Sequence, residues 1–362
     1  MVGNFKIPVC RPSISSLEKT MVNLAIDRNA ISSIGGFVEE FEELFAKKIG
    51  TKYAIAVNSG GSALFLALWV LGIKKGDEVI VPDFTMIATA NAVIQCGAKP
   101  IFIDAKYDTG NINPYLIEEK ITKRTKAIIP VHIYGHPCPM REIMEIADRY
   151  GLYVIEDAAE AHGAEYNGGK VGSIGDLGCF SFYANKIITT GEGGAITTNN
   201  KRWADELKRL RAYYFPQVGH FKHDKLGFNL RMSSLEAALG IAQLQRWDEL
   251  IGKHIAHARF YTKYLKGIVK TPIQKEGCKN VYWMYFIKTL YRDKLMKYLA
   301  NKGIETRTAF IPMHQQKFLK NKGLYPIADK LSKNGLYLPS ASDLTQEEQI
   351  EVIEAIKESN NQ

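Results

Sequence analysis

The chain has 362 residues, of which 46% are hydrophobic and 23% charged, and its formal net charge is +9; this suits a globular protein of two domains. Its lysines lie close to acidic residues along predicted helices and no nucleic-acid-binding module is recognisable, so the positive charge favours an anionic small-molecule substrate over a nucleic acid. No stretch is apolar enough to span a bilayer and no secretory signal is visible, so we expect a cytoplasmic protein without membrane attachment.

Residues 53–198 alternate short β-branched runs with helical patterns. In chain order the predicted strands are "YAIAV", "DEVIVP", "KPIFIDA", "KAIIPV" and "LYVIEDA". Helical patterns separate them at residues 62–72, 85–97, 113–121 and 139–151. Near-continuous apolar strands separated by helices indicate an α/β fold with a mainly parallel, helix-covered central sheet. Ligands of such sheets bind outside the C-terminal ends of the strands.

The pattern changes after residue 198. A charged amphipathic helix is predicted at residues 201–215, a polar loop at 216–233 and one long helix at 234–267. Shorter segments that follow predict a smaller α+β unit, which ends in a helix at 345–359. We place the domain boundary inside the long helix, which predicts a large α/β domain at residues 1–248 and a small C-terminal α+β domain at 249–362.

Polar and aromatic residues follow three of the predicted strands. In "NSGGSAL" a helix opens, where free backbone N–H groups and a hydroxyl form an anion site, although Ser-Gly pairs are also common helix caps. Phe84 could stack on a planar ligand or belong to the core. Asp157 is costly to bury unless it is paired with a cation, such as a protonated heterocyclic nitrogen, and the alternative is a helix N-cap.

Lys186 lies between a predicted strand, Cys179–Tyr183, and the glycine-rich turn "TTGEGG". The ordinary alternative is a surface lysine at the end of a hairpin. With a reference pKa near ~10.4, lysine is a poor nucleophile at neutral pH unless it is desolvated or near another cation. A Schiff base with a carbonyl cofactor would explain the residue. Gly191, Gly193 and Gly194 would let the backbone turn sharply beside it.

The five cysteines are scattered and form no CxxC pair, which suggests reduced thiols. None has a metal-ligand companion at usable spacing. Cys138 does lie near His132 and His136 in "VHIYGHPCPM", but packing is the favoured role there. We therefore expect no metal site.

Taken in order, phosphate cradle, aromatic residue, aspartate and lysine resemble the pyridoxal-phosphate (PLP) enzymes of the aspartate aminotransferase fold, fold type I. The chain resembles most the DegT/DnrJ/EryC1/StrS family of nucleotide-sugar aminotransferases. The resemblance covers nearly the whole chain and implies a small C-terminal α+β domain. It is carried by "NSGGSALFLAL", "GDEVIVPDFTMIATANAV", "VHIYGHPCPM", "VIEDAAEAHGAEYNGGKVGSIGDLGCFSFYANKIITTGEGGAITTNN" and "GFNLRMSSLEAALGIAQL".

This resemblance implies roles for individual residues. Lys186 would be the catalytic residue, which holds the cofactor covalently and later moves a proton. Asp157 would pair with the pyridine nitrogen, Glu160 would lie near the ring hydroxyl and Phe84 would stack on the ring. The implied phosphate contacts are Gly60, Gly61, Ser62, Ser181 and, from the neighbouring subunit, Asn229.

The contact from Asn229 implies a homodimer with shared active sites, whereas its ordinary alternative is a turn residue. Many relatives have threonine where this chain has Gly61, so one hydroxyl contact is missing or Ser62 replaces it. Candidate substrate contacts are His162, Lys222, Arg231 and Arg307. For His162 a structural role is an equal alternative.

The expected reaction transfers an amino group from L-glutamate to the C4 keto group of a nucleotide-linked 4-keto-6-deoxyhexose. The product would be of the GDP-perosamine or the UDP- or dTDP-viosamine type. One alternative is a PLP-dependent nucleotide-sugar 3-dehydratase, but those enzymes have histidine where this chain has Lys186. The other is a non-catalytic binding or regulatory protein on the same fold.

Overall fold

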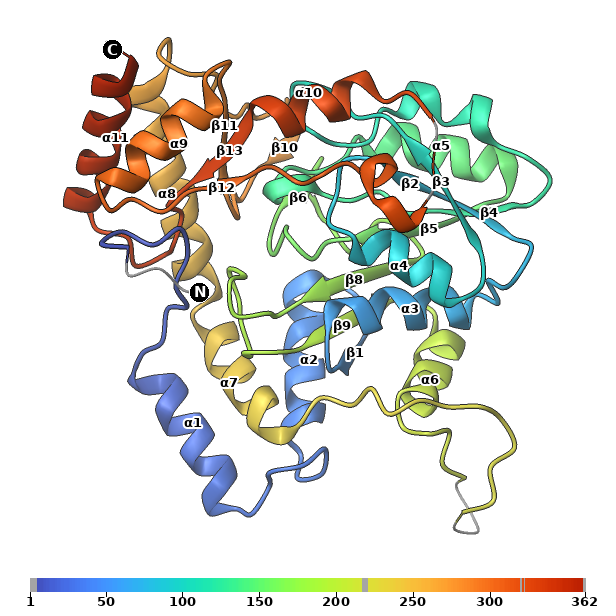
Figure 1. The fold of residues 1–362 in the computed structure, drawn as a ribbon. Coiled ribbons are helices and arrows are strands. Elements are labelled where there is room, and N and C mark those ends of the chain that lie inside the picture. Colours follow the sequence, from blue (N-terminus) through green and yellow to red (C-terminus); the bar gives the residue numbers. More distant parts are fainter. Residues whose placement is uncertain (1–4, 217–220, 320, 322, 361–362) are drawn as a thin grey trace.

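The computed structural model describes residues 5–216, 221–319, 321 and 323–360, and a mixed seven-stranded sheet forms the centre of this part of the chain (Figure 1). Its order is β1-β9-β8-β5-β4-β2-β3; β9 runs antiparallel to both neighbours and the other pairs are parallel. The prediction of a mainly parallel sheet is confirmed. The strand bounds are β1 Tyr53–Val57, β2 Glu78–Pro82, β3 Lys99–Ile103, β4 Thr125–Ile128, β5 Tyr153–Asp157, β8 Leu177–Ser181 and β9 Gly194–Thr198.

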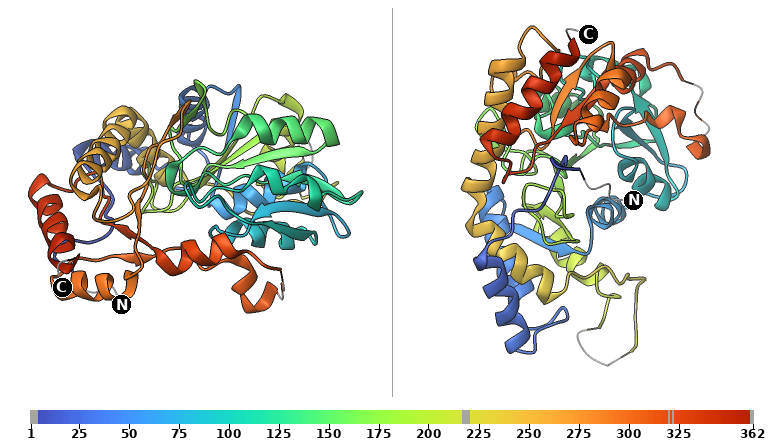
Figure 2. Two further views of the ribbon diagram at one scale, coloured as in Figure 1. Left: turned by 90° about the horizontal axis from the view of Figure 1, so that it is seen from above. Right: turned by 60° about the vertical axis from the view of Figure 1, so that its left-hand side comes forward.

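Helices cover both faces of the sheet because apolar side chains point alternately to its two sides. In β1, Ala54 and Ala56 belong to the hydrophobic cluster that contains residues of α2 and α7, whereas Ile55 and Val57 belong to the cluster with α3, α4 and α6. A further cluster packs the sheet against α5. Figure 2 shows the helices around the sheet from two further sides. The helix bounds are α2 Phe37–Ile49, α3 Gly60–Val70, α4 Ala88–Gln95, α5 Met140–Tyr150, α6 Lys201–Leu210 and α7 Ser234–Gln245.

The helical pattern at residues 113–121 does not form an α-helix. The segment folds into two 3₁₀ turns, η1 Pro114–Leu116 and η2 Glu118–Lys120. The side chain of Asn113 accepts the N–H of Tyr115 at one end, and Ile121 is already extended at the other, with ψ 130°. The segment is therefore too short for a stable α-helix, and tighter 3₁₀ turns are typical of such connections.

The long helix predicted at residues 234–267 is divided in two. Helix α7 ends at Gln245 and α8, Trp247–Leu265, begins two residues later, because Arg246 departs from helical geometry with φ −94° and ψ 10°. The guanidinium of Arg246 binds the buried carboxylate of Glu18 in α1, at 2.8 Å. The predicted domain boundary at residues 248 and 249 falls in the first turn of α8 and stays a prediction.

The C-terminal part has a small antiparallel sheet of its own, in the order β11-β13-β12. It packs with α8, α9 and α11 in a separate hydrophobic cluster, which also contains Ile7 from the N-terminal segment. In Figure 1 this part lies at the upper left, and the N-terminal segment runs from it down to α1. The bounds are β11 Tyr285–Lys288, α9 Arg292–Asn301, β12 Arg307–Thr308, α10 Pro326–Asn334, β13 Gly335–Leu338 and α11 Gln346–Asn360.

The remaining elements are short, apart from α1. Helix α1 packs beside α7, and a third sheet has the order β10-β6-β7. No helix among the described residues is both long and apolar enough to cross a membrane. The bounds are α1 Ser16–Asp27, η3 Ile133–Gly135, β6 Glu165–Tyr166, β7 Gly169–Lys170, β10 Cys278–Lys279, η4 Met313–Gln315 and η5 Lys317–Leu319.

Candidate active site

The predicted phosphate cradle forms where β1 leads into α3. Ser59 caps the helix by accepting the N–H of Ser62 at 3.1 Å, while the N–H groups of a helix's first residues, here Gly60 and Gly61, have no acceptor inside the helix. A Cβ on Gly60 would lie 2.7 Å from the Cβ of Ser181, at the end of β8. Glycine therefore lets the positive end of α3 approach the Ser181 hydroxyl, which creates an anion site.

The glycine-rich turn after Lys186 brings β9 to the same place. Gly191 and Gly193 have φ values of +88° and +141°, which confirms that glycine is needed there. Gly194 acts differently: its φ is not in the left-handed region, but a Cβ would lie 2.4 Å from the carbonyl oxygen of Ser59. Glycine at this position allows the backbones of β9 and the cradle to touch.

The hydroxyl of Ser62 already has a partner within the cradle. It donates to Asn58 Oδ1 at 2.7 Å and lies 2.9 Å from the hydroxyl of Ser59. A cavity of about 520 Å³ opens beside these residues, with Gly61 and Ser62 among its lining. The contact of Ser62 with a phosphate stays a prediction.

Asp157 lies at the C-terminal end of β5 and is 4% exposed. Its Oδ2 accepts the hydroxyl of Thr89 at 2.9 Å, and its Oδ1 accepts the N–H of Ala159 at 3.2 Å. Burial raises the pKa of Asp157, against which the Thr89 bond and the positive charge of Lys186 both act. A protonated ring nitrogen at this carboxylate would supply the cation that a buried aspartate requires.

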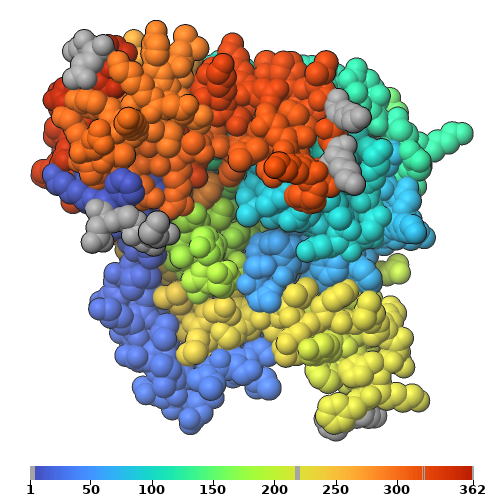
Figure 3. Space-filling view, viewed as in Figure 1, coloured from blue at the N-terminus to red at the C-terminus, as the bar shows by residue number. Residues whose placement is uncertain are grey.

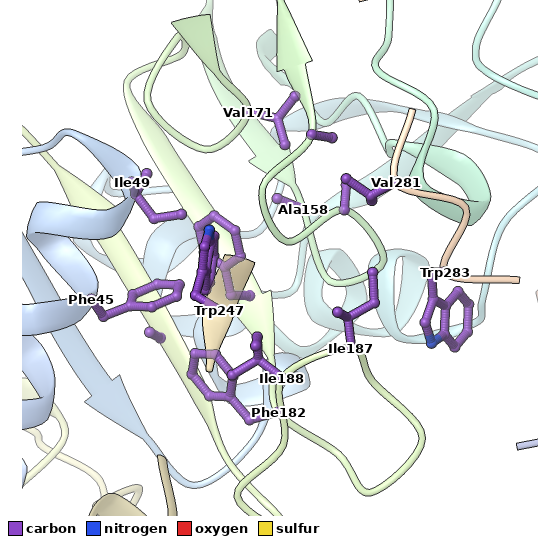
Figure 4. Close-up of a cluster of buried hydrophobic side chains, with 14 of the residues drawn as sticks. Phe45, Ile49, Ala158, Val171, Phe182, Ile187, Ile188, Trp247, Val281 and Trp283 are labelled. Atoms are coloured by element: carbon purple, nitrogen blue, oxygen red, sulfur yellow. The ribbon is translucent and has the colours of Figure 1, made fainter. Parts of the chain in front are cut away.

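Lys186 follows β8 in a turn that is anchored by two buried isoleucines, Ile187 and Ile188. Figure 4 shows the side chains of Ile187 and Ile188, which are 3% and 0% exposed, within the hydrophobic cluster beneath the turn. Lys186 itself is half-buried. Desolvation lowers the pKa of its amine, while the charges of Glu160 and Asp157 act in the opposite direction. The structure thus brings the predicted lysine and the two predicted carboxylates together.

Glu160 is 4% exposed and holds an unusual backbone turn. Its Oε2 accepts the N–H of Tyr134 at 2.7 Å, and Tyr134 has a left-handed φ of +52°. Burial raises the pKa of Glu160 to about 7, although the nearby charge of Lys186 lowers it. Non-glycine residues held in such rarely populated backbone conformations cluster at functional sites.

The family model of the DegT/DnrJ/EryC1/StrS aminotransferases matches residues 12–357. The chain belongs to this family. GDP-perosamine synthases of Escherichia coli O157:H7 and Caulobacter vibrioides are 42% and 43% identical to it, over 97% of the chain and 98% and 97% of those proteins. The structure of Spr1654 from Streptococcus pneumoniae in its PLP form aligns with a TM-score of 0.93 at 27% identity, over 98% of both chains.

A DegT/DnrJ/EryC1/StrS protein with this architecture is a PLP-dependent sugar-nucleotide aminotransferase of fold type I. The expectations of an enzyme and of PLP as its cofactor are therefore confirmed. The residues present fit the cofactor: the opening at Gly60 suits a phosphate, and buried Asp157 suits a protonated ring nitrogen. Lys186 lies within electrostatic reach of Asp157.

The predicted stacking role of Phe84 is not what the structure shows. Phe84 is 0% exposed and packs against Tyr134, Phe286 and Phe310. A ring without accessible surface offers no face to a ligand, so the core alternative applies. Met86, two residues later, has a side chain that is 50% exposed.

His162 is also fully buried. It is 0% exposed and lies among the rings of Phe180, Phe182 and Trp247. Burial lowers its pKa to about 3, and the positive charge of Lys186 adds to the effect. A neutral imidazole in an aromatic core is a structural residue, which corrects the prediction of a substrate contact.

Three other predicted residues lie together in one connecting segment of the chain. Lys222 and Arg231 belong to the segment between α6 and α7, at the bottom of Figure 1, where the guanidinium of Arg231 lies over the Tyr213 ring at 5.6 Å. Asn229 is exposed in the same segment, between two residues that line the cavity beside the cradle. Their contacts with substrate and with a neighbouring subunit stay predictions.

Arg307, in β12, lies closer to the centre of the site. Its positive charge lowers the pKa values of Cys10 and Tyr337, against the effect of burial, and Cys10 in turn interacts with Lys186. The side chain of Arg307 is half-exposed and binds Glu305 at 3.3 Å.

Figure 3 shows the light-green connection between β8 and β9 at the surface, between the orange C-terminal part and the blue and yellow segments.

Sequence reasoning missed three neighbours of the catalytic groups. Thr89 binds Asp157, while Trp283 and Cys10 both donate to the carbonyl oxygen of Asn185, at 2.7 and 3.4 Å. Thr89 stood in the quoted motif "TMIATANAV" and could have been found there. Trp283 and Cys10 carry no local signal, because only the fold brings residues so far apart in the chain to Lys186.

Proposed function

We propose that the chain transfers the amino group of L-glutamate to the C4 keto carbon of a nucleotide-linked 4-keto-6-deoxyhexose, giving a 4-amino-4,6-dideoxyhexose nucleotide. The observation that best supports amine transfer is the position of Lys186 near the buried carboxylates of Asp157 and Glu160, at the ends of the strands. The similarity to two GDP-perosamine synthases makes a GDP-linked sugar the first candidate. UDP- and dTDP-linked sugars of the viosamine type are the next to test.

When bound, PLP supplies the electron sink that stabilises negative charge on a carbon next to nitrogen. The chain's own residues set up that chemistry. Asp157 holds a proton on the ring nitrogen by its negative charge. Lys186 binds the cofactor and moves a proton at Nζ, which desolvation favours by lowering the pKa of the amine. Gly60, Gly61 and Ser181 anchor the phosphate.

The active form we propose is a homodimer. Asn229 is exposed beside the cavity at the cradle, and in the dimer it would reach the phosphate of the neighbouring subunit. Its replacement by alanine should weaken cofactor binding without lowering the melting temperature of the cofactor-free protein, because its side chain is exposed in the single chain.

A 3-dehydratase is the competing activity. The lysine at position 186 argues against it, since the dehydratases have histidine at that place. Product composition separates the two activities directly: amine transfer adds nitrogen to the sugar, whereas dehydration removes oxygen.

The deciding experiment incubates the protein with L-glutamate and a panel of GDP-, UDP- and dTDP-linked 4-keto-6-deoxyhexoses, with product mass and NMR as readouts. Lys186→Ala should abolish both amination and borohydride trapping of the cofactor. Lys201→Ala is the matched control, because Lys201 lies exposed on α6 and pairs only with Asp205 in the interactions described. Cofactor still trapped in Lys186→Ala would show that another lysine holds it.

A further inference from the structure

Trp283 joins the C-terminal part of the chain to the turn that carries Lys186. It lies just before β11 and is 5% exposed. Its indole N–H donates to the carbonyl oxygen of Asn185, the residue before Lys186, at 2.7 Å. Figure 4 shows Trp283 on the far side of Ile187 from Phe182 and Trp247. One side chain from beyond residue 280 therefore fixes the peptide unit next to the lysine.

The face of the same indole lies against the lysine amine. The Nζ of Lys186 is 3.8 Å from the centre of the Trp283 ring, well within the range of a cation–π interaction. Tryptophan provides the strongest such face among the aromatic residues, and desolvation strengthens the contact. The half-buried site thus contains an uncharged group that favours the ammonium form of Lys186.

The Trp283 ring has its own support. It stacks on Tyr134 at 6.3 Å and 29°, and Tyr134 is the left-handed residue whose N–H binds Glu160. Tyr134 also stacks on Phe310 at 5.1 Å. The position of the indole is therefore tied to the backbone turn that is held by the second carboxylate of the site, Glu160.

Packing alone would not require this arrangement. Ile187 and Ile188 already anchor the turn in the hydrophobic cluster. A buried indole N–H needs an acceptor in any case, but a tryptophan that only filled space would not need to place its ring face on the lysine amine. Both polar features of Trp283 are directed at Lys186 or at the residue before it.

We propose that Trp283 is a positioning residue for Lys186, whose ring face holds the lysine ammonium and whose N–H fixes the turn. The C-terminal part of the chain thereby sets the charge and place of an amine carried by the central sheet. This inference rests on the role given to Lys186 in the proposed function.

The test measures the pKa of Lys186 in the full-length protein after cofactor removal, from the pH dependence of amine labelling at this residue read by mass spectrometry. Trp283→Leu removes the ring face and should lower the pKa by about 0.5–1.5 units, which corresponds to a cation–π contribution of the usual size. Trp283→Phe keeps a weaker face and should show less than half of that shift. Trp247→Leu, at another buried tryptophan, controls for loss of packing and should leave the pKa of Lys186 unchanged.

The proposal is overturned if Trp283→Leu leaves the pKa of Lys186 equal to that of the wild type, or if Trp247→Leu lowers this pKa by the same amount. If Trp283→Leu does not fold, Trp283→Met replaces it with the same expected shift. In the cofactor-loaded protein, the pH midpoint of the visible absorption gives a second reading of charge at the same nitrogen. Borohydride trapping at Lys186 in the wild type tests the proposed function separately. An unchanged pKa would therefore count against the role of Trp283, whereas absence of trapping would count against the role of Lys186.

Discussion

Replacing Thr89 by valine tests how the buried aspartate is kept ionised. The substitution keeps the shape of the side chain and removes only the hydroxyl that donates to Asp157 Oδ2 at 2.9 Å. A hydrogen bond to a charged group contributes about 1.5–3 kcal/mol. Its loss should therefore raise the pKa of Asp157 by about 1–2 units, since one unit corresponds to about 1.4 kcal/mol.

The sign of the stability effect follows from the direction of that pKa. Burial already raises the pKa of Asp157 above its value in the unfolded chain, so the folded state loses stability as pH rises through this range. The Thr89→Val variant raises the folded-state pKa further. Its destabilisation should therefore be smallest at the acid end of the range, where protonation of Asp157 is favoured, and grow with pH as the carboxyl ionises.

The assay compares melting temperatures of the cofactor-free variant and wild type from pH 4 to pH 9. Thr85→Val is the matched control. Thr85 is as buried as Thr89, but its hydroxyl contacts the hydroxyl of Thr89, at 3.5 Å, and not the carboxylate of Asp157. The affinity for the cofactor at pH 8 is a second measurement. It should fall by at most about 10–150-fold, which is the hydrogen-bond free energy of about 1.5–3 kcal/mol expressed as a ratio of dissociation constants. A difference in melting temperature between variant and wild type that does not change with pH would refute the reasoning.

Two further predictions concern the same site. Gly60→Ala should lower the melting temperature of the cofactor-free protein and weaken cofactor binding, because the new Cβ would lie 2.7 Å from that of Ser181; Gly61→Ala, whose nearest atom would be 3.8 Å away, should not lower the melting temperature, and equal effects of the two would contradict this. Glu160→Gln should stabilise the cofactor-free protein above pH 7 and not at pH 5, since the raised pKa of about 7 means that ionised Glu160 costs stability there, while glutamine can still accept the N–H of Tyr134. Thermal unfolding across this pH range measures the effect, and a gain of equal size at pH 5 would show that charge is not its cause.

The sequence was informative wherever the chemistry is local. The alternation of apolar strands and helices predicted the central sheet, because period-2 and period-3.6 patterns are set by neighbouring residues. The lysine, the aspartate and the glycines of the motif around Lys186 could be recognised for the same reason. Gly191 and Gly193 do have the positive φ values that the motif implied.

Burial and long-range contact were decided by the tertiary structure. Phe84 and His162 stand in motifs that look functional, yet both are fully buried, because the depth of a side chain depends on which elements cover it. The break at Arg246 arises where its guanidinium meets Glu18, a residue more than 200 positions earlier. Likewise, Trp283 reaches Lys186 only after the C-terminal part has packed against the central sheet. The order of residues along the chain thus determined which reactive groups the protein carries, and folding decided which of them share one desolvated site, where charges interact strongly enough to shift their pKa values.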